Sequence, residues 1–324
     1  TDHGAGALSL LAVRGTPKYL FNVHLDTVPA APAWSRNPHD LLVTDDRAIG
    51  LGACDIKGAA AALLAVARVA DGPLALLFTS DEEANDTRCV KAFLQAHPAA
   101  ADDAFKAVIV AEPTRGRAVL AHRGIQSVAM RFAGKAGHAS KAQQPGDSAL
   151  HQAVRWGDAA LDFVASHDAS EFGGLTGLRF NIGRIEGGIK ANVIAPEAEL
   201  KFNMRPLPNM GADDLLARFQ SLAVVPPAAF AETFRGPSLP SGDPARAHQR
   251  RQAAEDLARS LAFPIGPAVD FWTESALFSA AGYTSFVYGP GDIAQAHAAD
   301  EWVALDQLDA YVQTLHGIVN RGIA

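Results

Sequence analysis

Short apolar strands alternate with helix-forming stretches along the first third of this chain, and this alternation is the feature that most restricts its fold. Residues 18–25, 73–80 and 105–113 are predicted strands, and residues 57–70 and 87–98 are predicted helices between them. The strands read as continuous apolar runs, which is typical of strands buried on both faces of a sheet. The sequence therefore predicts an α/β domain with a mostly parallel sheet.

The rhythm of the sequence changes after residue 122. Residues 124–134 alternate polar and apolar, and the predicted elements that follow are a helix over 146–165, strands over 179–188 and 192–206, a helix over 212–223 and a strand over 230–235. The order β-α-β-β-α-β is that of a ferredoxin-like unit, here with helices on one side only. We therefore expect an α/β domain of residues 1–122 and 237–324, interrupted by an α+β domain of residues 123–236.

Charge and composition limit the partners. The 324 residues carry a formal net charge of -7, which argues against nucleic acid because phosphate binding needs a basic face. The apolar stretch 58–67 is too short for a bilayer, which needs about 20 residues. No signal-peptide pattern opens the chain, although its start at Thr1 indicates that the natural N-terminus is missing. Two cysteines form no disulfide framework. We expect a cytoplasmic protein that acts on small molecules without binding membranes.

Histidines and acidic residues stand at the ends of predicted strands or in the loops that follow, where α/β sheets form sites. They are His24 and Asp26 in VHLDTVP, Asp55 in GACDIKG, Asp81, Glu82 and Glu83 in SDEEAND, Glu112 in IVAEPT and His297 in AHAADE. Each has an ordinary structural explanation on its own, such as a helix cap or a solvated loop. Asp26 shares a strand face with His24, so its carboxylate can lie behind the imidazole, as in many zinc sites.

Together these residues predict a site for two divalent cations. Two histidines and three carboxylates suit a pair of metal ions that share a bridging Asp. Nitrogen and oxygen ligands without a thiolate favour zinc, with cobalt or manganese as alternatives. Cys54 has no partner motif that would make it a nucleophile. The segment GLGACD lacks the third glycine of a dinucleotide fingerprint, which argues against a nucleotide-binding oxidoreductase.

The ordered segments VHLDTVP, GACDIKG, SDEEA, AEPT and AHAADE closely resemble the two-zinc amidohydrolase and metallopeptidase family of acetylornithine deacetylase and succinyl-diaminopimelate desuccinylase. Residues 134–140 and 187–206 are similar to the inserted domain of that family. The resemblance implies a zinc-peptidase-like catalytic domain, interrupted by a ferredoxin-like lid that forms a homodimer through residues 123–236. The sequence departs from the family at Leu51, at Ala59 and after the Glu pair, where Ala84, Asn85 and Asp86 stand.

The same resemblance implies roles for individual residues. His24, Asp55 and Glu112 would hold one zinc ion, and Asp55, Glu83 and His297 the other. Glu82 would be the general base, and Asp26 would orient His24. His138 would reach the partner subunit's active site and stabilise the oxyanion. Asn192 and Arg205 would help to bind the substrate, with Arg205 at its carboxylate.

The implied reaction is the hydrolysis of an N-acyl amino acid in arginine biosynthesis, with N-acetylcitrulline favoured over N-acetylornithine. Citrulline has a neutral ureido group where ornithine has a cation, so the two pockets should differ in one or two acids. The enzyme alternatives are a succinyl-diaminopimelate desuccinylase, which should need an extra cation near the acyl pocket, and a di-zinc dipeptidase or carboxypeptidase. A metal-binding regulatory protein without catalysis is a further alternative, against which the presence of Glu82 with all five ligands argues.

Overall fold

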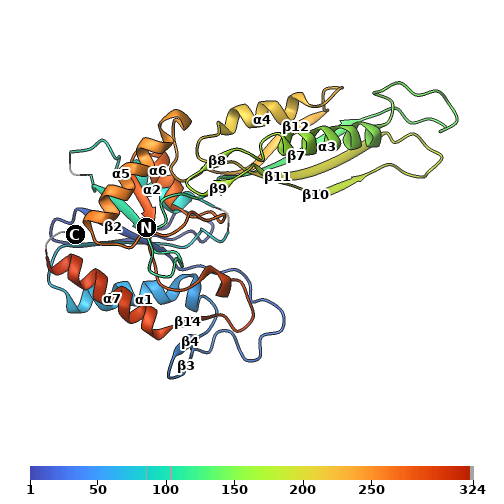
Figure 1. Ribbon diagram of the computed structural model, residues 1–324. Helices are drawn as coiled ribbons and strands as arrows, with labels where there is room; N and C mark the ends of the chain where they lie inside the picture. Colours follow the sequence, from blue (N-terminus) through green and yellow to red (C-terminus); the bar gives the residue numbers. More distant parts are fainter. Residues whose placement is uncertain (85, 103, 322–324) are drawn as a thin grey trace.

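The computed structural model describes residues 1–84, 86–102 and 104–321, so that Asn85 lies outside the described residues. Two parts are visible in Figure 1. A layered α/β body contains the first and the last described residues, and an elongated lid, residues 125–236, projects from it. No helix among the described residues is both long enough and apolar enough to cross a membrane.

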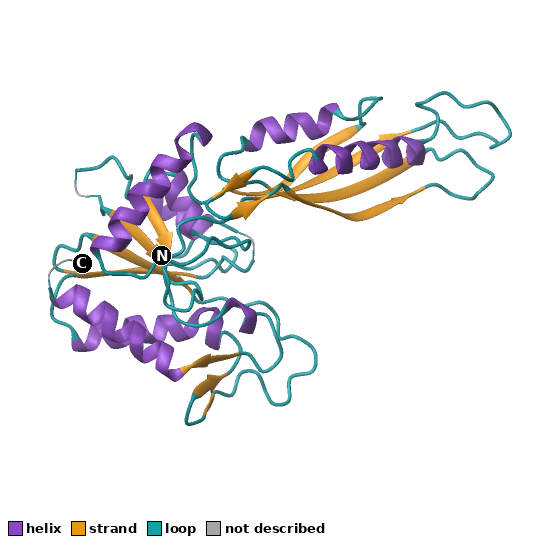
Figure 2. Ribbon diagram, in the orientation of Figure 1, coloured by secondary structure: helices purple, strands orange, loops and turns teal. Residues whose placement is uncertain are grey.

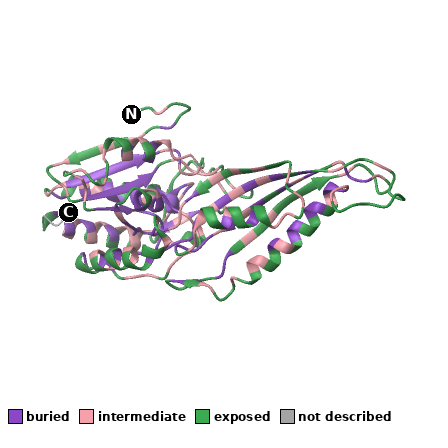
Figure 3. Cartoon of the chain, turned by 90° about the horizontal axis from the view of Figure 1, so that it is seen from above, coloured by how far each residue is buried: buried purple, intermediate pink, exposed green. Residues whose placement is uncertain are grey.

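The five-stranded sheet of the body has the order β1-β5-β2-β6-β13. Its strands are β1 (Leu10–Arg14), β2 (Tyr19–His24), β5 (Leu74–Thr79), β6 (Ala107–Val110) and β13 (Thr284–Val287). Only β1 pairs antiparallel, so the mostly parallel sheet is confirmed. All residues of β2, β5 and β6 are buried, as their continuous apolar runs predict, and Figure 3 shows them as the buried centre of the body.

Helices cover both faces of this sheet because alternate strand residues point in opposite directions. Phe21 of β2 belongs to the core that includes α1 (Gly58–Val69), α5 (Ala247–Ser260) and α7 (Leu305–Asn320). Its neighbour Leu20 belongs to the core of α2 (Arg88–Ala96) and α6 (Ser275–Ala280). The two helices α1 and α7 lie side by side (Figure 1).

The lid contains a four-stranded antiparallel sheet of order β10-β11-β7-β12. Its elements are β7 (Ile125–Ala133), α3 (Ala149–Ala165), β10 (Arg179–Gly187), β11 (Glu197–Arg205), α4 (Ala212–Ser221) and β12 (Ala229–Gly236). Trp156 of α3 and Phe219 of α4 both pack on Phe202 of β11, with ring centroids 4.9 and 5.4 Å apart. Both helices therefore cover the same face, as the predicted β-α-β-β-α-β unit requires. The domain boundaries at residues 122 and 236 stay a prediction.

Several short elements were not predicted, because runs of about two to six residues show too little periodicity. The hairpin β8 (Glu171–Phe172) and β9 (Leu175–Thr176) lies in the lid, and the six-residue α6 lies in the body. A small sheet joins β3 (Leu42–Val43), β4 (Arg47–Ile49) and β14 (Trp302–Ala304), seen at the lower edge of Figure 2. Short helical turns occupy η1 (Ala53–Lys57), η2 (Pro244–Arg246) and η3 (Ile293–Gln295). The small sheet matters for the site because it joins the segments before Asp55 and after His297.

Candidate metal centre

Three neighbouring strands deliver their side chains to one edge of the main sheet. Strands β5, β2 and β6 are adjacent and parallel, so their carboxyl ends meet. His24 is the last residue of β2, and it pairs in register with Thr79, the last residue of β5. The loop after β5 carries Glu82 and Glu83, and Glu112 follows β6 by two residues. The topology therefore gathers residues that lie far apart in the sequence.

Asp55 reaches the same edge from the turn that precedes α1. This turn needs a glycine, since Gly52 has a φ of 80° and a Cβ there would lie 2.8 Å from Thr27 Cγ2. The residues from Ala53 to Ile56 are buried, and Asp55 is 6% exposed. A carboxylate buried to this degree requires positive partners.

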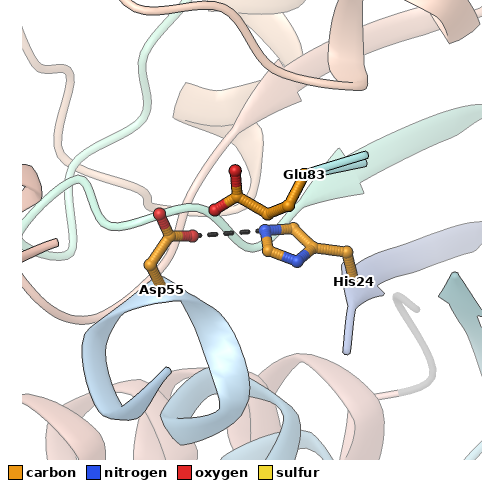
Figure 4. A group of neighbouring side chains, drawn as sticks. All are labelled: His24, Asp55 and Glu83. Atoms are coloured by element: carbon orange, nitrogen blue, oxygen red, sulfur yellow. Dashed lines mark hydrogen bonds and ion pairs between the residues drawn. The ribbon is translucent and has the colours of Figure 1, made fainter. Parts of the chain in front are cut away.

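The two oxygens of Asp55 face different histidines. Asp55 Oδ1 lies 3.2 Å from His24 Nε2, and Oδ2 lies 3.1 Å from His297 Nε2. Glu112 Oε1 is 3.5 Å from His24 Nε2, and Glu83 Oε1 is 2.7 Å from His297 Nε2. Figure 4 shows how His24, Asp55 and Glu83 converge, with ligand atoms within 4.8 Å of one another. The structure thus brings together all five predicted ligands, in two groups that share Asp55.

The donor atoms suit divalent cations. Glu112 Oε1 is buried and has no hydrogen-bond partner among the described residues, so it is left for a ligand. Imidazole nitrogens and carboxylate oxygens are ligands of zinc and similar metals. Cys54 does not join them, because its thiol donates to the main-chain oxygen of Asp292, and burial raises the pKa of this thiol to about 12. This argues against Cys54 as a ligand or nucleophile.

The imidazoles carry the positive charge that the carboxylates demand. Hydrogen bonds to Asp55 and then Glu83 raise the pKa of His297 to about 10. Burial opposes protonation of His24, but the charge of Glu112 and the hydrogen bonds to aspartates raise its pKa well above the ordinary value. Burial likewise opposes ionisation of Asp55, yet the two histidines hold its pKa well below the ordinary value. Bound cations would replace these imidazole protons.

Two further carboxyl groups in the cluster resist ionisation. Burial, reinforced by the charge of Asp55, raises the pKa of Glu112 well above its ordinary value. Burial raises the pKa of Glu82 to about 8, and the neighbouring carboxylates of Glu274 and Glu83 add to this effect against the opposing charge of His24. The cluster therefore contains more carboxyl groups than its two histidines could neutralise if all of these groups were ionised.

Asp26 lies behind His24, but the orienting contact differs from the expected one. His24 Nδ1 lies 3.0 Å from the main-chain oxygen of Asp26, whereas the Asp26 carboxylate oxygen Oδ1 is 3.5 Å away. The second carboxylate oxygen of Asp26 accepts the main-chain N–H of Glu83 at 2.9 Å. Asp26 thus links two of the candidate ligands, with its main chain beside His24 and its side chain beside Glu83.

A cavity of about 530 Å³ opens beside the cluster and is also lined by Glu82 and, from the lid, by Arg205. His138 and Asn192 do not line it. Both are exposed, and their segments meet where the N–H of Ala139 donates to the Asn192 oxygen at 3.0 Å. The loops that carry them lie at the end of the lid away from the body (Figure 1). Within one chain, the structure brings Arg205 to the site but not His138 or Asn192.

The Glu301 side chain, which sequence reasoning missed, holds the loop that presents Asp55. Glu301 Oε1 accepts the main-chain N–H groups of Cys54 and Asp55, both at 2.9 Å, and Oε2 accepts that of Gly52 at 3.0 Å. The side chain is 2% exposed. Because Glu301 also stands four residues after His297, it ties the bridging carboxylate to the loop of the second histidine. Glu301 closes the segment AHAADE, which carries part of the family resemblance, but the pattern does not indicate that its side chain holds the Asp55 loop.

The model of the peptidase family M20/M25/M40 matches residues 20–321. The chain belongs to this family. It is 66% identical over 319 residues to N-acetyl-L-citrulline deacetylase of Xanthomonas campestris pv. campestris, which covers 98% of this chain and 86% of that protein. It is 30% identical over 317 residues to acetylornithine deacetylase of Klebsiella pneumoniae, covering 94% of this chain and 77% of the relative.

Solved structures agree on the fold. Aminopeptidase PepT from Bacillus cereus matches with a TM-score of 0.70 at 19% identity, over 99% of this chain and 86% of the other. A metallo-carboxypeptidase of the same family from Sulfolobus solfataricus matches with a TM-score of 0.64 at 15% identity, over 98% of this chain and 88% of the other. The predicted family, fold class and hydrolase activity are confirmed, and membership implies divalent metal ions.

Replacing Glu301 should weaken metal binding without touching a ligand. In Glu301→Gln, either orientation of the amide sets an NH2 group against main-chain donors, so the Asp55 loop loses its anchor. We expect metal affinity to fall about 10–100-fold, the usual effect of disturbing the partners of a ligand. Titration calorimetry with zinc measures this effect. Asp300→Asn is the matched control, because the Asp300 carboxylate accepts hydrogen bonds only from Ser35 among the described residues. Unchanged affinity in Glu301→Gln would contradict the role.

Once a chelator has removed the metal ions, the stability of the folded protein should fall as the pH rises. The raised pKa of His297, about 10, means that its protonation stabilises the chelated protein fully below an unfolded-state pKa of 6.5 and is lost as the pH approaches 10. The raised pKa values of Glu82 and Glu112 act in the same direction. In loaded protein, protons compete with the cations, so metal stabilisation grows with pH. The Tm difference between loaded and chelated protein should therefore widen from pH 6.5 to about pH 9. Thermal scans measure both Tm values. A Tm difference that stays constant over this pH range would contradict the prediction.

Proposed function

We propose that this protein hydrolyses the amide bond of N-acetyl-L-citrulline, releasing acetate and citrulline in a step of arginine biosynthesis. The observation that carries the reaction class is the shared carboxylate of Asp55, with one oxygen facing each histidine. The substrate rests on the 66% identity to N-acetyl-L-citrulline deacetylase. The 30% identity to acetylornithine deacetylase supports N-acetyl-L-ornithine as the second candidate. The proposed place of action is the cytoplasm.

The proposed cofactors are two divalent cations, zinc first, with cobalt or manganese as alternatives. One would be held by His24, Asp55 and Glu112, and the other by Asp55, Glu83 and His297. Bound there, the pair would polarise the acyl carbonyl and lower the pKa of the attacking water.

Glu82 is the proposed general base. It lines the cavity next to the ligands, while the adjacent Glu83 turns to His297. Glu82 would take a proton from the attacking water and deliver it to the leaving amine. A carboxyl group whose pKa is raised to about 8 suits both steps, because it can accept and release a proton near neutral pH.

The proposed substrate contacts come from the lid. Arg205 lines the cavity, and its guanidinium would bind the substrate carboxylate. His138 and Asn192 lie at the far end of the lid, so they would act in the partner subunit's active site of a homodimer. Strand β10 is an edge strand of the lid sheet, and an edge of this kind can pair across a two-fold axis.

Loaded protein should release citrulline from N-acetyl-L-citrulline, and Glu82→Gln should lower kcat about 10²–10⁴-fold while keeping both metal ions. Glu83→Gln is the informative contrast, since it should lose one metal ion. Amine release measures turnover, and elemental analysis measures the metal. Near-normal turnover of Glu82→Gln would exclude Glu82 as the base, and no release from either acetylated amino acid would exclude the proposed substrates.

Two inactive variants should complement each other if His138 acts across the dimer. In a mixed dimer of Glu82→Gln and His138→Ala chains, one site receives an intact Glu82 from its own chain and an intact His138 from its partner. Random mixing should restore roughly a quarter of the normal activity per chain, since half of the dimers are mixed and each has one intact site. A mixture no more active than its parents, or a monomer by light scattering, would contradict the homodimer proposal.

A further inference from the structure

The cavity beside the candidate metal centre has an acidic end and a basic end. The acidic end contains the candidate ligands and Glu82. The lid and its junction supply Arg123, Arg179 and Arg205, and the only acid lining the cavity apart from that cluster, among the described residues, is Asp270. The distribution of charge at this basic end bears on the choice between neutral and cationic substrate side chains.

Asp270 is already paired. Arg123 Nε donates to Asp270 Oδ1 at 2.5 Å, and the rest of the guanidinium donates to the main-chain oxygens of Gly177 and Thr176 at 2.6 and 2.7 Å. The Arg123 side chain is fully buried. Its charge is therefore fixed beside Asp270 and offsets the charge of this carboxylate, whose side chain is 67% exposed.

The other two arginines form no ion pair in the described part of the chain, although the charge of Asp270 also acts on Arg205. Arg179 of β10 and Arg205 of β11 stand directly opposite each other in the antiparallel register. Like charges in this position repel each other. No ion pair or hydrogen bond is found for either guanidinium within residues 1–84, 86–102 and 104–321. Arg205 is half-buried, and Arg179 is exposed on the cavity wall.

We propose that this basic end selects N-acyl amino acids with an uncharged side chain, and that Arg179 is the residue that repels a cationic one. This inference rests on the proposed function and names the substrate class that the site takes. With one guanidinium matched to the substrate carboxylate, a second positive charge remains in the cavity. A ureido group is neutral and presents a carbonyl oxygen that a guanidinium can donate to. An ammonium group at the same place meets positive charge, and Arg123 already offsets the charge of the nearby carboxylate of Asp270.

Three substrates separate charge from size. N-acetyl-L-norleucine has nearly the shape of N-acetyl-L-ornithine but ends in a methyl group instead of an ammonium group, and N-acetyl-L-citrulline adds the ureido group. For the unmodified protein, kcat/KM should be lowest for the ornithine compound. The penalty relative to the norleucine compound should shrink when the salt concentration rises from about 20 mM to about 300 mM, because salt screens an exposed charge.

Variants of Arg179 test the residue itself. Arg179→Gln should raise the ornithine-to-norleucine ratio of kcat/KM roughly three- to tenfold, and Arg179→Glu should raise it further, as expected for removal and reversal of one partly screened charge. Arg218→Gln is the matched control, since Arg218 is exposed on α4 and does not line the cavity. An unchanged ratio in both Arg179 variants would overturn the proposal.

Binding measured without turnover keeps the two proposals distinguishable. Calorimetry on zinc-loaded Glu82→Gln protein, with and without Arg179→Gln, gives the affinity for each compound. Hydrolysis with equal affinities for the ornithine and norleucine compounds would overturn the charge selection and leave the proposed function intact. Selective binding of the uncharged compounds, with no hydrolysis by the unmodified protein, would support the charge selection and overturn the proposed function. Tighter binding of N-succinyl-L-norleucine that is lost in Arg179→Gln would assign Arg179 to the acyl group and also overturn the proposal.

Discussion

The position of one buried carboxylate, that of Asp55, is the constraint on which the rest of the site depends. Each of its oxygens faces a different histidine, and the two histidines come from opposite ends of the chain. Asp55 can reach this position only because Gly52 adopts a left-handed turn and because Glu301 holds the main chain around it. The conformation of the Asp55 loop therefore depends on hydrogen bonds to a residue some 250 positions away in the sequence.

Electrostatics divides the cavity into two ends that complement each other. Carboxylates gather where strands β2, β5 and β6 end, and their burial demands cations. Arginines gather where the lid joins the body, and two of them form no ion pair in the described structure. A substrate that presents a carbonyl at one end and a carboxylate at the other fits this arrangement. An N-acyl amino acid has both groups, which is why the geometry and the family relationship lead to the same reaction class.

Much of the fold could be predicted from local patterns. The continuous apolar runs over 73–80 and 105–113 became β5 and β6 of the parallel sheet, and the alternation over 124–134 became β7 of the lid. The small sheet of β3, β4 and β14 could not be predicted, because strands this short carry no periodicity. This small sheet matters for the site because Trp302 of β14 pairs with Ile49 of β4. Trp302 directly follows Glu301, and Ile49 precedes the turn that leads to Asp55.

The sequence by itself determined which residue types stand at the strand ends, and hence that His24, Asp55, Glu83, Glu112 and His297 were candidates for one cluster. This was possible because a parallel sheet places its carboxyl ends together. Only the tertiary structure decided that the main chain of Asp26 contacts His24, that Glu301 holds the Asp55 loop, and that Arg179 faces the cavity opposite Arg205. These contacts join residues through register, burial and main-chain hydrogen bonds, which depend on how distant segments pack and leave no pattern along the chain.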